Sequence, residues 1–443
     1  MKVAVAGMTI ELNGMSEQER EEAVREVFQS AEREQIGKAE VLPLTDYQLR
    51  RAIVFAGKQA GVCKAQESYF ETAVLGEEAA KVRFNGATKS GHHSVAEHVT
   101  ITIELEGISK MMAMILNSLQ DYVTSEKSGR FTVMGCNDEK QKALYDKWYQ
   151  IIFDFIKENA LVPINHALPE DNQKKQQLAM ISEKAKENAR YMLSVFNPAT
   201  SMAYSGSLLH WNYVIDWCEG FQQYKGQNKF TAKIAEELET LGFALERILK
   251  VDTLRDKRAR EFDFLAKQVG HPASEITEED EVIRDVYQVS YKASMVALAQ
   301  LQRNRTAKLW MIFNGEATEF YVPEFFVGTK YEQEWLRDLA SITDEIPQAT
   351  LVKVVENGQI GNFLTFRCTD RLCFRAMNEA KNVVAALMVR FKEEGKFSKG
   401  WQEEFDSWFN EKGNPVCRCL SSSKLNECRE KCGHQALAIT RIC

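Results

Sequence analysis

The sequence lacks a long hydrophobic run, an excess of positive charge and a secretion signal. No apolar stretch approaches the roughly 18 to 20 residues that a membrane-spanning helix needs, so we expect no membrane association. The 443 residues carry a formal net charge of −7, which argues against coating nucleic acid, because binding along its backbone requires a basic surface. The first 14 residues hold one lysine and a short strand-like run, which is not the pattern of a signal peptide. These absences predict a cytoplasmic protein.

What is present is typical of a soluble α+β protein with two or three domains. Apolar residues make up 44% of the chain and charged residues 27%, as in ordinary globular domains. Hydrophobic periodicity and β-branched content predict strands and helices. The expected strands cover 3–11 and 99–106, the second being the one clear strand between 75 and 247, and the expected helices cover 16–35, 47–61 and 108–119.

An internal repeat is the main organising feature. The segment ISKMMAMILNSLQDY at 108–122 can be laid over ASMVALAQLQRNRTA at 293–307, since each is an apolar helix that ends in polar residues. We place the boundary between the repeats near 251–256. The predicted organisation is an extension at 1–66, repeats at 67–250 and 251–412, and a tail at 413–443.

The loop that follows the first apolar helix has the composition of a phosphate site. Ser128, Gly129 and Arg130 combine a hydroxyl, a residue that permits close backbone approach and a guanidinium group. Glu126 precedes them and could hold a ribose hydroxyl or orient the arginine. The alternative is a plain turn.

Three histidines lie within seven residues, at 92, 93 and 98. Imidazole is a good ligand for zinc or iron, but the spacing does not suit a helical metal pair and no acidic cluster adjoins it. We therefore favour hydrogen bonding or cofactor contact over metal binding.

Cations gather at the end of the second apolar helix. Arg303 and Arg305 follow Gln300 there, and arginine is costly to bury without a partner. They indicate either a bound anion or a solvated helix end that complements the helix dipole.

Several motifs together resemble those of the flavin-dependent thymidylate synthases. The first half contains G-H-H-S with E-H at 91–98, E-G-I-S at 106–109 and E-x-S-x-R-F at 126–131, in the family's order. The second half contains Q-x-x-R-N-R-x-A at 300–307 and R-x-C-x-R-A-M-x-E at 371–379. The first half lacks the family's R-H-R, where Ser118, Leu119 and Gln120 stand. The second half lacks the rear of the signature, where Met311, Phe313 and Gly315 stand.

These losses are complementary. In this family the nucleotide site forms at a subunit interface, and here each half keeps the residues that the other has lost. The resemblance therefore implies two tandem copies of the family's fold, with an antiparallel or mixed sheet and long helices, forming a pseudo-dimer with one composite site. Two chains are expected to pair into a pseudo-tetramer.

The implied reaction is reductive methylation of dUMP to dTMP, with methylene-tetrahydrofolate as carbon donor and FAD reduced by NADPH. The alternative is a degenerate homologue that binds flavin or a pyrimidine nucleotide without this catalysis, or that acts on another pyrimidine nucleotide. No protein nucleophile is required, which agrees with the lack of a Cys/His arrangement near the motifs.

The resemblance also implies residue roles. Arg303 and Arg371 are expected to be catalytic, with Arg367 as a substitute for Arg371. The implied substrate-binding residues are Glu126, Ser128, Gly129, Arg130, Arg190, Gln300, Arg303 and Arg371. The implied FAD-binding residues are His92, Ser94, Arg303, Asn304 and Arg305. Asn304 and Met377 depart from the family's His and Gln.

Five of the ten cysteines fall in the last 27 residues. Cys417, Cys419, Cys428 and Cys432 have spacings that a structural zinc ion could accept. Reduced structural thiols explain them equally well, and an iron–sulfur or disulfide role is the third alternative.

Overall fold

The computed structural model describes most of the chain, which forms two compact units. The described residues are 1–9, 15–26, 31–64, 75–119, 122–129, 131–162, 169–255, 263–265, 281–283, 285–373, 376–395, 397–417 and 420–421. Unit 1 comprises Met1–Ala113, Asp121–Lys127 and Pro198–Phe262, and unit 2 comprises Met114–Gln120, Ser128–Asn197 and Asp263–Cys443. The units do not follow chain order, and the four predicted sequence segments stay a prediction.

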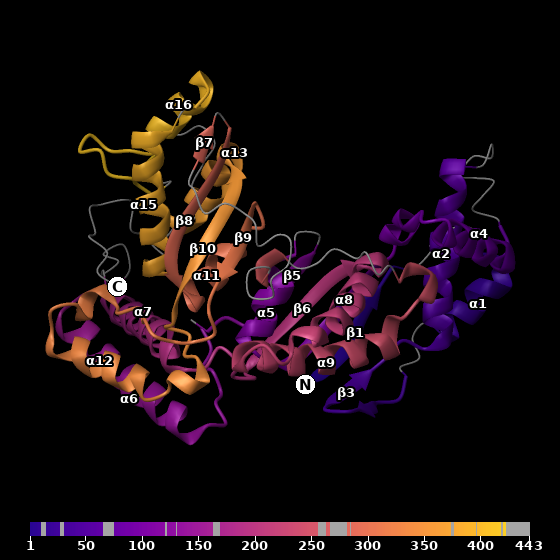
Figure 1. Cartoon of the computed structure of the whole chain (residues 1–443), viewed down its shortest axis with the longest axis horizontal. Helices are drawn as coiled ribbons and strands as arrows, with labels where there is room; N and C mark the ends of the chain where they lie inside the picture. The colour runs from indigo at the N-terminus through magenta and orange to yellow at the C-terminus, as the bar shows by residue number, and fades with distance from the viewer. Residues whose placement is uncertain are drawn as a thin grey trace. The chain divides into compact units, whose positions relative to one another are not determined.

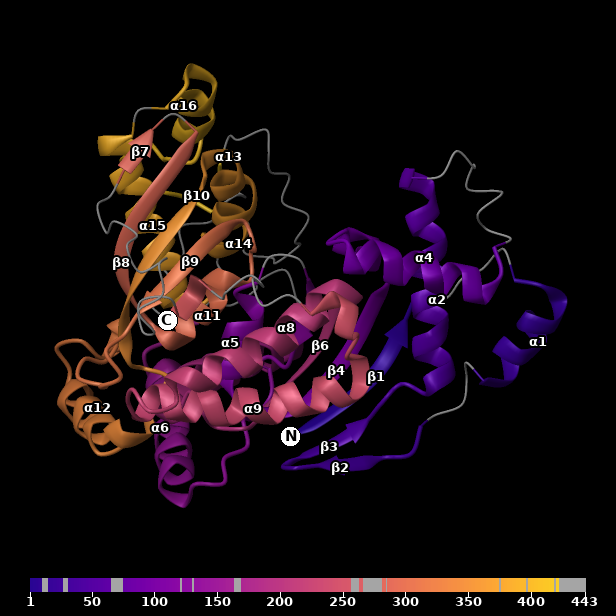
Figure 2. The same ribbon diagram turned by 45° about the vertical axis from the view of Figure 1, so that its right-hand side comes forward.

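Unit 1 is built on a six-stranded mixed sheet. Its strand order is β2-β3-β1-β4-β6-β5, with β1 and β3 parallel and the other neighbours antiparallel. The strands are β1 (Lys2–Met8), β2 (Glu34–Ile36), β3 (Ala39–Leu42), β4 (Thr100–Ile108), β5 (Val123–Glu126) and β6 (Thr200–Ser207). The helices are α1 (Glu17–Glu26), α2 (Asp46–Lys64), α4 (Glu77–Lys89), η1 (His93–His98), α8 (Leu208–Phe221) and α9 (Lys229–Leu249). Helices α8 and α9 run side by side, and α9 packs on β1 and β3 (Figure 2).

The central strand of this sheet follows directly from its sequence. Ile101, Ile103 and Leu105 of β4 are fully buried, whereas Thr100 and Glu104 are exposed. This alternation matches the two-residue period of a strand with one covered face. Apolar helix α5 (Lys110–Asn117) begins immediately after it.

Unit 2 is built on a four-stranded antiparallel sheet in the order β7-β8-β10-β9 (Figure 1). The strands are β7 (Glu281–Ile283), β8 (Val286–Ser294), β9 (Ala307–Ile312) and β10 (Leu351–Gln359). The helices are α6 (Glu139–Glu158), α7 (Glu170–Ala189), η2 (Arg190–Met192), α11 (Met295–Gln302), α12 (Lys330–Ala340), α13 (Ile360–Asn362), α14 (Thr369–Arg371), α15 (Asn378–Glu394) and α16 (Lys399–Asp406). A π-helical turn, Phe363–Cys368, joins α13 to α14.

The two sheets share one connectivity. In unit 1 the chain runs β4, α5, β5, then later β6 and α8, and β6 lies between β4 and β5. In the second half it runs β8, α11, β9, then later β10 and a helical segment, and β10 lies between β8 and β9. This match supports the tandem duplication, which remains a prediction.

The predicted α+β class is confirmed, and most predicted elements are found. The strands at 3–11 and 99–106 and the helices at 47–61 and 108–119 correspond to β1, β4, α2 and α5. The helix at 16–35 is wrong at its end, because Glu34–Ile36 pairs with β3 across a turn at Gly37. The single strand predicted between 75 and 247 is also wrong, because β5 and β6 join β4 there. None of the helices in the described ranges is long and apolar enough to cross a bilayer.

Candidate functional site

Helix α11 carries the first part of the predicted second-half set. It begins at Ser294, whose Oγ accepts a hydrogen bond from Ala297 N at 3.1 Å, a helix cap. Its length is almost entirely buried, and it ends at Gln302. The chain then turns so that Arg305 N donates to Gln302 O at 3.0 Å, with φ of Arg305 at +53°.

The end of α11 is held by arginines from the segment that follows β10. Arg371 Nη2 donates to Gln300 O at 2.6 Å, and Arg367 Nη2 donates to Leu301 O at 3.2 Å. Carbonyls in the last turn of a helix have no partner inside it, so these bonds satisfy them and complement the helix dipole. Gln300 and Arg371, both predicted as substrate ligands, are therefore in direct contact.

Arg367 belongs to the core. It is 1% exposed and forms an ion pair with Glu356 of β10, which is 0% exposed. Tyr287 and Tyr291 each donate to the same carboxylate at 2.6 Å. Burial and the neighbouring carboxylate raise the pKa of both phenols well above its usual value. This enclosure favours Arg371 over Arg367 for substrate contact.

Arg190 joins a first-half loop to a second-half helix within unit 2. Its side chain packs on Gly129, where an added Cβ would lie 3.3 Å from both Cδ and Nη1. A side chain at position 129 would therefore crowd the Arg190 guanidinium, which would have to shift by a few tenths of an ångström. Arg190 is 5% exposed, and its Nη2 lies 3.2 Å from the sulfur of Met377, at the start of α15. Gly129 and Arg190 are thus in contact, whereas Arg130 lies outside the described residues.

A buried carboxylate adjoins this contact. Glu379 accepts hydrogen bonds from Ser294 N at 2.7 Å, Ser294 Oγ at 2.6 Å and Tyr191 Oη at 2.6 Å. It links the start of α11 to the residue after Arg190. Burial raises its pKa, although the hydrogen bonds oppose the shift.

Glu126 lies in unit 1, whereas Ser128 and Gly129 lie in unit 2. It ends β5, and its carboxylate pairs with Lys110. The Glu126 side chain is 2% exposed. A ribose-binding role requires this ion pair to open or to share its carboxylate.

The predicted FAD residues divide between the units. His92 and Ser94 are exposed at η1 of unit 1. Arg303 and Arg305, half-buried and exposed respectively, follow α11 in unit 2, together with Asn304, whose Nδ2 donates to Asp370 Oδ2 at 2.8 Å. Two guanidinium groups on this turn suit an anionic group such as a pyrophosphate.

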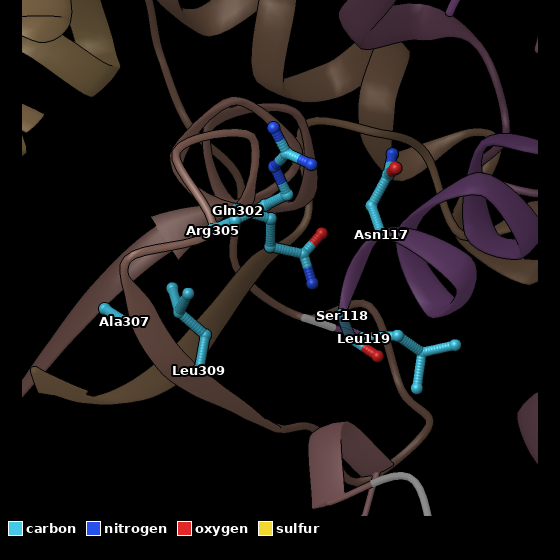
Figure 3. Close-up of a pocket in the computed structure, with 7 residues that line it drawn as sticks. All are labelled: Asn117, Ser118, Leu119, Gln302, Arg305, Ala307 and Leu309. Atoms are coloured by element: carbon cyan, nitrogen blue, oxygen red, sulfur yellow. The ribbon is translucent and has the colours of Figure 1, made fainter. Parts of the chain in front are cut away.

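A small hollow in unit 2 adds a residue that the sequence analysis missed. It lies between the residues after α5 and the last turn of α11, and Figure 3 shows the Gln302 amide pointing toward Ser118 and Leu119. Gln302 is 2% exposed. Gln302 is an unspecified position of the motif Q-x-x-R, so the motif gave no reason to select it. A polar residue in an otherwise apolar helix could have indicated it.

The cysteine tail lies almost wholly outside the described residues. Cys417 is described, whereas Cys419, Cys428 and Cys432 are not. Over the described ranges no group of three or more His, Cys, Asp or Glu side chains is placed to hold a metal ion. The zinc hypothesis stays a prediction.

Residues 45–218 match the family model described as thymidylate synthase complementing protein. No curated protein sequence matches the chain. Similar solved structures include a UMP/dUMP methylase, PolB, from Streptomyces cacaoi bound with 5-Br dUMP. It is 13% identical with a TM-score of 0.24, over 44% of this chain and 92% of that chain. Another is the flavin-dependent thymidylate synthase ThyX from Helicobacter pylori complexed with FAD and dUMP. It is 15% identical with a TM-score of 0.21, over 45% of this chain and 96% of that chain.

Proposed function

We propose that the chain is a flavin-dependent thymidylate synthase that methylates dUMP, since residues 45–218 match the family model described as thymidylate synthase complementing protein. The observation that carries the proposal is the position of Arg190. This buried guanidinium packs on Gly129 of the first half and contacts Met377 of the second. A composite site requires such a meeting of the two halves, and the planar guanidinium group of arginine suits a phosphate.

In this proposal each half contributes a different part of the nucleotide site. Ser128, Gly129, Arg130 and Arg190 hold the phosphate of dUMP, and Glu126 holds its ribose. Gln300, Arg303 and Arg371 act on the pyrimidine side, where positive charge offsets the negative charge that develops on the ring. Arg303 and Arg371 are the proposed catalytic residues. The bond from Arg371 to Gln300 O fixes one guanidinium nitrogen and so orients the others.

FAD fits the donor set at the end of α11, because Arg303 and Arg305 flank Asn304 on one short turn. His92 and Ser94 complete the proposed contacts. When bound, FAD supplies a hydride at the pyrimidine, after reduction by NADPH, and methylene-tetrahydrofolate supplies the carbon. The protein residues bind, orient and stabilise charge. We further propose that two chains pair, so that four copies of the fold assemble.

A second candidate is a protein that binds flavin or a pyrimidine nucleotide without catalysis. Two contacts favour it: Arg190 meets a thioether where the resemblance expects an amide, and Asn304 bonds to Asp370. In both contacts a side chain that the resemblance assigns to a ligand is already bonded within the protein.

The test is dTMP formation by the purified full chain with dUMP, methylene-tetrahydrofolate, FAD and NADPH. We expect flavin absorbance that NADPH bleaches, and dTMP as product. Arg303→Ala should lower dUMP affinity by at least 100-fold, whereas Arg390→Ala, which removes an arginine of α15 bonded to Glu394, should not. Normal dUMP binding by Arg303→Ala disproves the composite site. Nucleotide binding without dTMP selects the second candidate, and a protein that cannot take up FAD ends the flavin proposal.

A further inference from the structure

The hollow between α5 and α11 contains a buried amide that needs a partner. Gln302 is 2% exposed, and within the described part of the chain neither its Oε1 nor its Nε2 has a hydrogen-bond partner. Gln348 provides a contrast: it is 4% exposed, and its Nε2 donates to Ser194 O at 3.3 Å. A buried polar group without a partner is costly, so this one indicates a ligand.

The walls of the hollow define what can enter. Asn117, Ser118 and Leu119 form one side, and Gln302 and Arg305 form the other, all within unit 2 (Figure 3). The hollow is small, and the volume of about 230 Å³ between its walls includes open solvent. The groups that line it, and not its size, therefore identify what enters. Arg305 lines it from a left-handed backbone conformation that a non-glycine residue adopts at a cost.

We propose that Gln302 reads the imide edge of a heterocycle, that is, a ring N–H beside a ring carbonyl. The amide offers one acceptor and two donors in one plane. Its Oε1 accepts the ring N–H, while its Nε2 donates to the adjacent ring carbonyl. Uracil and the flavin ring both present this edge, and the Arg305 guanidinium beside Gln302 can donate to a ring carbonyl.

This inference rests on the proposed function for its class of ligand, but it concerns recognition and not turnover. It makes Gln302 a specificity-determining residue, one position before the arginine of the resembling motif. A site built on two hydrogen bonds discriminates strongly against an analogue that lacks one of them, because the buried partner is then left unpaired.

The test compares binding of dUMP and FAD with binding of their N3-methylated forms, by calorimetry on the full chain. For the wild type we expect one of the two probes to lose roughly 10- to 100-fold in affinity on N3-methylation. For Gln302→Leu we expect weak binding of that probe and no further loss on methylation. Loss in the dUMP pair identifies the nucleotide as occupant, and loss in the FAD pair identifies the cofactor.

Thermal unfolding without ligand provides the matched control. Gln302→Leu removes two unsatisfied polar atoms and should not lower the melting temperature, whereas Gln348→Leu breaks a buried hydrogen bond and should lower it. The proposal is overturned if neither probe binds, if N3-methylation has no effect, or if Gln302→Leu retains the discrimination. It is also overturned if Gln302→Leu is as unstable as Gln348→Leu, since the amide then has a partner within the fold. Binding that follows these expectations without dTMP formation rejects the catalytic proposal alone.

Discussion

The sheet around β4 and the sheet around β8 share their framework and differ at their functional ends. In each, a serine precedes the apolar helix and donates to a buried glutamate: Ser109 Oγ to Glu237 Oε2 at 2.5 Å, and Ser294 Oγ to Glu379 Oε2 at 2.6 Å. Each also has a glycine as the next-to-last residue of the second strand that follows the apolar helix in the chain. This glycine is Gly206 in β6 and Gly358 in β10. These shared groups stabilise the fold.

The differences gather where the helices end. After α5 the chain continues with Ser118 and Leu119, and after α11 with Arg303, Asn304 and Arg305. The helix that follows β6 is lined with buried apolar residues, whereas the segment that follows β10 carries Arg371 at the end of α11. Arg367 of the same segment belongs to the framework, because it is buried and paired with Glu356. Framework residues should therefore affect stability, and residues at the helix ends should affect binding. The four predictions below test this division.

The largest effect is expected from Arg367→Met. Removal of the guanidinium leaves the Glu356 carboxylate buried and unpaired at the centre of the second sheet, which should lower the free energy of unfolding by about 3–5 kcal/mol. The α8 side of the first sheet contains no equivalent ion pair within the described residues. Urea unfolding measures the change. The double variant Glu356→Gln/Arg367→Met should recover part of it, because the amide carries no charge and its oxygen still accepts a tyrosine hydrogen bond. A loss below about 1 kcal/mol for Arg367→Met contradicts the assignment.

Glu237 should make stability depend on pH. Burial raises its pKa to about 7, against the hydrogen bond from Ser109. The folded state therefore holds the proton at pH values where the unfolded state, near 4.5, has lost it. This contribution is complete below about pH 4.5 and is lost as the pH rises through 7, a decrease of roughly 3 kcal/mol.

Glu237→Gln should remove that dependence, because an amide does not titrate in this range. Its oxygen can still accept the Ser109 hydrogen bond, so the fold should be kept. Unfolding curves between pH 4.5 and 8 should be flatter for the variant, which should be the more stable protein at pH 8. Glu379→Gln is the contrasting change, since two hydroxyls donate to Oε2 and would face an amide donor, so it should be destabilising. Equal pH profiles for wild type and Glu237→Gln would contradict the buried acid.

The two strand glycines should differ in their tolerance of alanine. At Gly358 an added Cβ would lie 2.7 Å from Tyr287 Oη, and Tyr287 is buried and bonded to Glu356. Gly358→Ala should therefore cost about 1–2 kcal/mol, because a fixed side chain cannot move away. At Gly206 the neighbour is the half-buried ring of His210, at 2.6 Å, which can shift toward solvent at the cost of its hydrogen bond with Tyr204 Oη. Thermal unfolding should find Gly206→Ala the milder change; the reverse order would refute this argument.

The sequence predicted the parts of the molecule that depend on local pattern. β4 alternates buried and exposed residues, and α5 and α11 are continuous apolar runs, so periodicity sufficed. β6 was missed because TSMAYSGS is made largely of small and polar residues and becomes a strand through pairing on both sides.

The candidate site could be predicted only in part, for the same reason. Gln300, Arg303 and Arg371 stand in recognisable motifs, so their positions could be named. The contacts of Arg190 with Gly129 and Met377, and the pairing of Ser109 with Glu237, join residues far apart in the chain. No local pattern encodes such pairs. Gln302 was passed over because its significance depends on burial without a partner, which is a property of the fold.

The smallest stability effect is expected from Asn304→Ala, at the end of α11. Asn304 is half-buried, and its hydrogen bond to Asp370 is exposed, so its loss should cost less than about 1 kcal/mol of unfolding free energy. If the turn at 303–305 holds FAD, affinity for FAD should nevertheless fall, because the amide lies between the two arginines. Unfolding without ligand and fluorescence titration with FAD separate the two effects. If Asn304→Ala is as unstable as Arg367→Met and keeps its FAD affinity, Asn304 belongs to the framework. The division between the connectivity that the two sheets share and the chemistry at their helix ends then fails.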